Sequence, residues 1–109
     1  MSVETRVIEP VSFDHLAQIM AENTTVLDFC AKWCGPCKNA AEPFRQMSLT
    51  YPNVKFIKVD IDVTDSKITE YFQVKSLPTF IVVKNGKNVY RKEGYNPGVF
   101  PEIKNFLWN

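Results

Sequence analysis

The chain has 109 residues, enough for one domain with its own hydrophobic core, and its 13 Lys and Arg nearly balance its 12 Asp and Glu. The formal net charge of +1 gives no electrostatic reason to bind nucleic acid or an anionic membrane surface. No apolar stretch approaches the roughly 18 residues of a membrane span, and residues 1–10 lack the apolar segment of a secretory signal. We therefore expect a soluble protein with neither nucleic acid nor membrane as a partner.

The three cysteines are an odd set, whereas secreted scaffolds held by disulfides more often carry an even number. The sequence has no internal repeat, low-complexity tract or linker rich in Gly, Ser or Pro, which predicts a single domain over residues 1–109. Cysteine usage of this kind predicts a reducing, cytoplasmic location.

In chain order the pattern first predicts a strand at 3–8, a helix from Phe13 and a strand at 25–31. A helix that begins within the segment 34–37 and runs to about Thr50 follows, then a strand at 54–61 and a short helix at 68–72. The last elements are strands at 79–84 and 87–92 and a helix from Pro97. Asn85-Gly86 is a strong hairpin signal, so the last two strands are expected to be antiparallel. Asn96 is a candidate N-cap for the last helix, with Pro97 at its first position. The order predicts an α/β fold, with a mixed sheet of about five strands flanked by four helices.

Two cysteines lie three positions apart in Cys34-Gly35-Pro36-Cys37, directly after Trp33. Thiols at this spacing are able to form a disulfide with each other and to break it again. Cys34 is expected at a helix N-terminus, where the helix dipole favours the thiolate, so it is the candidate nucleophile and Cys37 the resolving thiol. Pro36 fixes φ and Gly35 adds no bulk, which is expected to hold the two sulfurs close and leave Cys34 open to a partner.

These residues, with others along the chain, resemble thioredoxins over nearly the whole length. The matching segments are Asp28-Phe29, Trp33-Cys34-Gly35-Pro36-Cys37-Lys38, Lys58-Val59-Asp60-Ile61-Asp62, Leu77-Pro78-Thr79-Phe80 and Asn85-Gly86-Lys87. The resemblance implies the thioredoxin fold. It also implies a protein-disulfide reductase and electron carrier, and a low reduction potential from Gly35-Pro36.

The resemblance extends to partners and cofactors. It implies recycling by an NADPH-dependent thioredoxin reductase, with NADPH and FAD bound by that reductase and no cofactor bound by this chain. Substrates would be disulfide-containing proteins such as peroxiredoxins or ribonucleotide reductase, and we expect a monomer. The alternative is a redox fold kept as a binding module or as a subunit of a larger assembly. The presence of both Cys34 and Cys37 favours the enzyme.

Asp28 is a carboxyl group inside an apolar strand, which is costly unless the group has a partner or a task. Burial is expected to raise its pKa, so that it takes a proton near neutral pH. The resemblance implies that Asp28 accepts the proton of Cys37 and that Lys58 lies near it. In the alternative interpretation, Asp28 is partly exposed at a strand edge or pairs with Lys58 for structure alone.

Substrate contacts are also implied by the resemblance. Pro78 matches a proline that thioredoxins hold in cis beside the two cysteines, although most prolines at strand starts are ordinary trans residues. Trp33 is expected to lie over the site, with core filling as the alternative. Leu77, Gly94 and Tyr95 are expected to complete the contact surface from neighbouring loops.

Cys30 ends the strand at 25–31 and is expected to be a small buried apolar side chain. The alternative is a metal site in which Cys30, Cys34, Cys37 and His15 form a Cys3His set. His15 has no zinc-ligand spacing to the cysteines, so we expect no metal and interpret His15 as a solvated helix residue.

The long second helix departs from the family pattern. Thioredoxins usually place a kink-forming proline five residues after the second cysteine, but Glu42 occupies that position here and Pro43 follows it. Proline removes a helical hydrogen bond, so a bend is still expected, after the dithiol.

Overall fold

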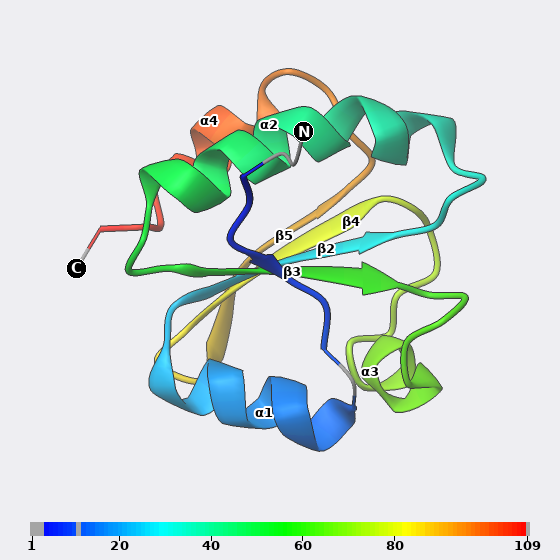
Figure 1. Ribbon diagram of the computed structural model, residues 1–109, viewed down its shortest axis with the longest axis horizontal. Helices are drawn as coiled ribbons and strands as arrows, with labels where there is room; N and C mark the ends of the chain where they lie inside the picture. Colours follow the sequence, from blue (N-terminus) through cyan, green and yellow to red (C-terminus); the bar gives the residue numbers. More distant parts are fainter. Residues whose placement is uncertain (1–3, 11, 109) are drawn as a thin grey trace.

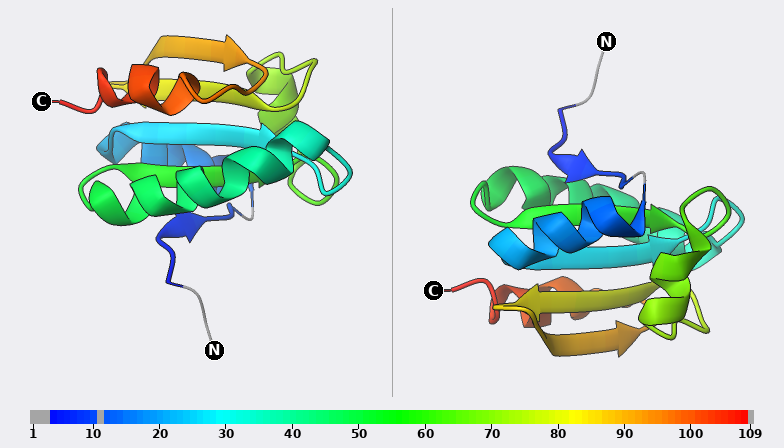
Figure 2. Two further views of the ribbon diagram at one scale, coloured as in Figure 1. Left: turned by 90° about the horizontal axis from the view of Figure 1, so that it is seen from above. Right: turned by 90° about the horizontal axis from the view of Figure 1, so that it is seen from below.

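The computed structural model describes residues 4–10 and 12–108. The elements are β1 (Val7–Ile8), α1 (Phe13–Glu22), β2 (Thr25–Cys30), α2 (Gly35–Thr50), β3 (Lys55–Asp60), α3 (Ser66–Tyr71), β4 (Thr79–Lys84), β5 (Lys87–Glu93) and α4 (Val99–Lys104). The five strands form one sheet in the order β1-β3-β2-β4-β5, and Figure 2 shows them side by side in this order. The predicted mixed sheet with four helices is confirmed.

Helices cover both faces of this sheet. Figure 1 shows α2 and α4 above the sheet and α1 and α3 below it. β2 pairs in parallel with β3 and antiparallel with β4, and all six of its residues are buried. Because successive side chains of a strand point to opposite faces, β2 contributes to a hydrophobic layer on each side. The dithiol follows directly from this central strand.

Two hydrophobic clusters therefore make the core. The cluster on the α2 and α4 side includes Val26, Phe44, Phe56, Phe80 and Phe100, and the cluster on the α1 and α3 side includes Leu16, Leu27, Phe29, Ile57 and Ile81. Asp28 lies in the strand between these apolar neighbours and is 3% exposed. The fold thus holds a carboxyl group inside the sheet, on the same strand that leads to the two cysteines.

The hairpin between β4 and β5 forms as its sequence predicts. Asn85 and Gly86 have φ values of 53° and 75°, and positive φ at both central residues is the mark of the two-residue turn whose twist matches that of the strands. The antiparallel pairing of β4 and β5 is confirmed.

Two predicted element ends are wrong. The first strand is limited to Val7–Ile8, and Met1 to Val3 lie outside the described residues. The last helix begins at Val99, because the Asn96 side chain accepts a hydrogen bond from the Gly98 amide at 2.8 Å and forms a turn before the helix. Phe106 and Leu107 follow the helix rather than belonging to it, yet both pack against the core.

The short helix α3 buries fewer side chains than its pattern predicts. Ile68 and Phe72 are buried, as expected, but Tyr71 is 64% exposed. Its ring contacts those of Phe13 and Phe72, with centroids 5.1 and 4.9 Å apart, so it covers the end of α1 from outside.

Helix α2 runs without interruption through Pro43. In the position before it, Glu42 pairs with Arg45 at 2.6 Å, and Arg45 also donates to the carbonyl oxygen of Glu4. The Arg6 amide donates to the Ser48 hydroxyl at 3.1 Å. These contacts tie the segment before β1 to α2. None of the helices in the described parts of the chain is both long and apolar enough to cross a membrane.

Candidate active site

The two cysteines of the motif are joined by a disulfide at the start of α2, with their Cα atoms 5.3 Å apart. Cys34 is the N-cap residue, and its sulfur accepts a hydrogen bond from the Cys37 amide at 3.3 Å. When the disulfide is reduced, this amide and the positive end of the helix dipole stabilise a negative sulfur on Cys34. Cys34 therefore lies at the start of a helix, as the sequence predicts.

In the disulfide form both cysteines are largely covered. Cys34 is 6% exposed, less than the expectation of an open thiol, and Cys37 is 5% exposed. Trp33 is 68% exposed, and Gly35 and Pro36 are exposed beside it. The core-filling alternative for Trp33 is wrong, because its ring lies on the surface next to Cys34.

A small groove begins at Cys34, with a volume of about 230 Å³; we call it the front groove. Its lining residues are Trp33, Cys34, Ile61, Thr69, Val74, Lys75, Ser76 and Leu77. Trp33 is held at the groove by a hydrogen bond of 2.9 Å from its indole Nε1 to Asp62 Oδ2. Asp62 belongs to one of the segments that resemble thioredoxins, but no sequence pattern predicts its contact with Trp33, which lies 29 positions away.

The loop before β4 contributes backbone groups to the site. The Leu77-Pro78 peptide bond is cis, as the resemblance implies, and the carbonyl oxygen of Pro78 accepts a hydrogen bond from the Gly94 amide at 2.7 Å. Gly94 has a φ of 87°, which favours glycine at this position. Leu77 packs against the cluster that holds Cys30, Ala31, Cys34 and Cys37.

The structure does not bring Tyr95 to the front groove. The Tyr95 ring packs against Phe80 and Phe100, with centroids 6.3 and 5.6 Å apart, and it supports the hydrophobic layer under α4. Gly94 also does not line this groove, and its link to the site is the hydrogen bond to Pro78.

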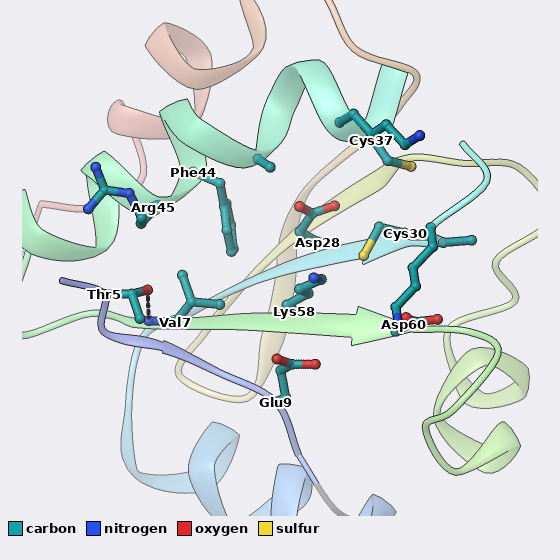
Figure 3. A pocket seen from close by; sticks show the side chains of 14 residues that line it. Thr5, Val7, Glu9, Asp28, Cys30, Cys37, Phe44, Arg45, Lys58 and Asp60 are labelled. Atoms are coloured by element: carbon teal, nitrogen blue, oxygen red, sulfur yellow. Dashed lines mark hydrogen bonds between the residues drawn. The ribbon is translucent and has the colours of Figure 1, made fainter. Parts of the chain in front are cut away.

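A second and larger groove, of about 630 Å³, lies on the α2 side of the sheet; we call it the rear groove. Its lining residues are Thr5, Val7, Glu9, Asp28, Cys30, Ala31, Lys32, Cys37, Lys38, Ala41, Phe44, Arg45, Lys58 and Asp60. Figure 3 shows Asp28 between the sheet and α2, with Cys37 on the helix side. No described residue lines both grooves, and each groove is lined by one of the two cysteines.

Asp28 is the titratable group at the floor of the rear groove. Burial raises the pKa of its carboxyl from the ordinary 3.8 to about 7, and the positive charge of Lys58, its neighbour in β3, opposes part of that rise. Its Oδ1 atom is buried and has no hydrogen-bond partner among the described residues. The alternative of a partly exposed carboxyl at a strand edge is therefore wrong, since Asp28 is 3% exposed in a central strand.

Cys30 is buried beside the dithiol, in one cluster with Ala31, Cys34 and Cys37. Burial first, and then the nearby Asp28 carboxylate, raise the pKa of its thiol to about 12. His15 lies on α1, below the sheet, is half-buried, and its amide donates to the Ser12 hydroxyl at 3.1 Å. Among the described residues, no group of three or more His, Cys, Asp or Glu side chains is arranged to hold a metal ion.

We predict that Cys30 reacts slowly with alkylating agents in the native, reduced protein, because burial and the Asp28 carboxylate disfavour its thiolate. Mass spectrometry after brief treatment with iodoacetamide should find label on at most Cys34 and Cys37, and on Cys30 only after unfolding. Cys30→Ala should keep reductase activity at a modest cost in packing. Prompt labelling of Cys30, or an oxidised form that joins it to Cys34, would make Cys30 a regulatory thiol instead.

Comparisons with known proteins agree with this geometry. The family model described as Thioredoxin matches residues 4–105. Thioredoxin H5 of Oryza sativa subsp. japonica is 39% identical over 94 residues, which cover 84% of this chain and 69% of that protein.

Solved structures show the same fold. The thioredoxin NaTrxh of Nicotiana alata superposes with a TM-score of 0.86 at 31% identity, and the match covers 100% of this chain and 98% of that one. A chain from a study of thiol resolution in a yeast mitochondrial 1-Cys peroxiredoxin via glutathione/thioredoxin systems has a TM-score of 0.84 at 27% identity, covering 94% of this chain and 99% of that one. Family match, fold and disulfide-forming pair together show that the chain belongs to the thioredoxin family and is a thiol–disulfide oxidoreductase.

Proposed function

We propose that the protein reduces disulfides of other proteins, with Cys34 as nucleophile, Cys37 as resolving thiol and Asp28 as acceptor of the Cys37 proton. The observation that carries this proposal is the placement of the three groups. Cys34 caps α2 and lines the front groove, whereas Cys37 and the buried Asp28 line the rear groove. Members of this family act through their own dithiol and need no bound cofactor.

The reaction follows two exchanges. The Cys34 thiolate attacks one sulfur of the substrate disulfide, the substrate S–S bond breaks, and one substrate thiolate leaves. Cys37 then gives its proton to Asp28 and attacks Cys34 Sγ, which forms the Cys34–Cys37 disulfide and releases the second substrate thiolate. Two electrons pass to the substrate. We propose that a flavin-containing thioredoxin reductase returns them from NADPH.

The residues around the dithiol have supporting roles in this proposal. Lys58 is paired with Asp28 across the strands, so its charge tunes the Asp28 carboxyl. Gly35 and Pro36 set the redox properties of the pair. Trp33 and Leu77 bind substrate at the front groove. The buried cis Pro78 orients the backbone of Leu77 for pairing with an extended substrate, and Gly94 holds Pro78 in place. Tyr95 acts through the packing of this loop.

We further propose peroxiredoxins and ribonucleotide reductase as substrate classes. The peroxiredoxin class is supported by the similar chain from the yeast peroxiredoxin study. A cytoplasmic, monomeric protein of one domain over residues 1–109 is our proposal for its setting, because a free buried thiol beside a redox pair suits a reducing compartment.

A coupled assay tests the proposed function. Purified protein, a thioredoxin reductase and NADPH should reduce a protein disulfide in many turnovers, followed as loss of NADPH absorbance. Omission of the protein should leave only the background rate. No turnover with reductases of several types, by a protein whose dithiol chemical reductants still reduce, would favour the binding module over the reductase.

We predict that Trp33→Ala raises KM for a protein disulfide about tenfold, because an exposed aromatic ring at a contact surface commonly contributes more than about 1 kcal/mol. The rate with a small disulfide such as hydroxyethyl disulfide should change little. Trp108→Ala is the matched control, since Trp108 is also exposed, at 74%, but its carbonyl contacts Lys84 at the other end of the sheet. An equal loss in both variants, or an unchanged KM for Trp33→Ala, would remove Trp33 from the contact surface.

A further inference from the structure

Asp28 and Cys30 lie two positions apart in β2 and therefore face the same side of the sheet. Their partners in β3 are Lys58 and Asp60, so two cross-strand pairs stand side by side. All four residues line the rear groove, and Figure 3 shows them beneath α2. Neither the family match nor the proposed mechanism assigns a function to Cys30.

The Asp28 carboxyl is incompletely satisfied. Its Oδ1 atom is buried with no hydrogen-bond partner in residues 4–10 and 12–108, and the residue is 3% exposed. A buried acceptor of this kind costs free energy, and in native proteins it calls for a reason. The adjacent side chain on the same face is a thiol, which is only a weak hydrogen-bond donor. A hydroxyl at the same position would be a strong donor to a carboxylate.

We propose that Cys30 is a positioning residue for the thiol–disulfide reaction, because its thiol lies beside Asp28 in the rear groove without giving Oδ1 a strong hydrogen bond and so keeps the carboxyl basic. The inference rests on the proposed role of Asp28 as proton acceptor. Asp28 lies close enough to act on Cys30, since the Asp28 carboxylate is the second cause, after burial, of the raised pKa of the Cys30 thiol. A base that faces Cys37 must hold a proton near neutral pH, and a strong donor at position 30 would weaken it.

Other titratable groups surround Asp28 and stay unchanged in the test below. The titratable groups that line the rear groove around it are Glu9 near β1, Lys32 in the loop after β2, Lys58 and Asp60 from β3, and Cys37, Lys38 and Arg45 from α2. Of these, Lys58 lowers the pKa of Asp28, while burial raises it. A change at position 30 from thiol to hydroxyl alters none of these charges, so it isolates the hydrogen bond.

The test is a titration of the Asp28 carboxyl carbon by NMR in the oxidised protein, where Cys34 and Cys37 carry no titrating proton. Cys30→Ser should lower the midpoint by about one pH unit, because a hydrogen bond to the charged form favours that form. Cys30→Val keeps an apolar side chain of similar size and should leave the midpoint where it is. Val59→Thr, which buries a hydroxyl on the opposite face of the sheet, is the control for a buried hydroxyl as such.

Each outcome of this titration either supports or overturns the inference about Cys30. An unchanged midpoint in natively folded Cys30→Ser, or an equal shift in Cys30→Val, overturns the inference and leaves the proposed function standing. If Cys30→Ser does not fold, Cys30→Thr supplies the same hydroxyl with a strand-forming side chain. The proposed role of Asp28 is tested separately, by the pH profile of the resolving step in the reduced protein. A profile that fails to follow the shifted Asp28 midpoint overturns that role.

Discussion

Cys34→Ser should show no disulfide reduction above the uncatalysed rate, whereas Cys37→Ser should still attack substrates and accumulate as mixed disulfides with them. The expected difference follows from the helix start. The Cys34 sulfur lies at the N-cap and accepts a hydrogen bond from the Cys37 amide, so we expect Cys34 to form the thiolate. Without the resolving thiol, the covalent intermediate has no internal route to release. The measurement is non-reducing gel electrophoresis with mass spectrometry of the trapped species, beside the turnover assay.

Cys30→Ala is the matched control for this pair, because it removes a thiol from the same cluster without touching the dithiol and adds no hydrogen-bond donor beside Asp28. It should form no mixed disulfides and should keep turnover. Trapping by Cys34→Ser and not by Cys37→Ser would reverse the assignment of nucleophile and resolving thiol.

The elements that the sequence predicted well are those with strong local signals. Asn85-Gly86 forms the expected turn because few residues adopt positive φ at two successive positions. Helix α1 begins at Phe13 as expected, and the Ser12 hydroxyl caps it. The start of α4 was wrong because Asn96 is equally suited to an N-cap and to the turn it actually makes, which is completed by the Gly98 amide. The first strand is short because its length depends on pairing with Phe56 and Ile57 in β3, which local sequence does not encode.

In the site, too, features with a local sequence signal were predicted and features that depend on tertiary contacts were not. The motif itself predicted the disulfide and the placement of Cys34 at a helix start, and an acidic residue in an apolar strand pointed to a raised pKa for Asp28. The contact between Trp33 and Asp62 depends on how the loop after β3 folds back, so residue types alone give no signal for it. The packing of Tyr95 against Phe80 and Phe100 also could not be predicted, because it too is a tertiary contact.

The two grooves were also absent from the sequence pattern, because they are properties of the layers. The front groove lies at the loops beyond the sheet, whereas the rear groove lies between α2 and the strands β1, β2 and β3. Cys34 and Cys37 are three positions apart, yet nearly one helical turn sends them to different grooves. A substrate seated at Cys34 therefore leaves the surroundings of Asp28 in place, which suits a base that works while the mixed disulfide is bound.

Asp28→Asn should slow the resolving step at pH 7 by about 100-fold, the lower end of what a positioned general base contributes, and leave attack by Cys34 unchanged. The effect should be largest near and below neutral pH and should narrow above pH 8, where solvent base takes the Cys37 proton. Single-turnover reduction of a protein disulfide between pH 6 and 8 measures this. Equal rates in both proteins across that range would exclude Asp28 as the proton acceptor.

The same substitution should make the protein more stable, in a pH-dependent way. The pKa of Asp28 rises from 3.8 to about 7 on folding, so between these values the folded chain keeps a proton that the unfolded chain has released. Stability contributed by the neutral carboxyl is present at pH 4 and is lost as the pH rises towards 7. Asn stays neutral, so the variant should gain up to about 4 kcal/mol in free energy of unfolding at pH 8, and little at pH 4. Urea unfolding at both pH values checks this, and an equal effect at the two would show that the Asp28 carboxyl keeps its ordinary pKa in the fold.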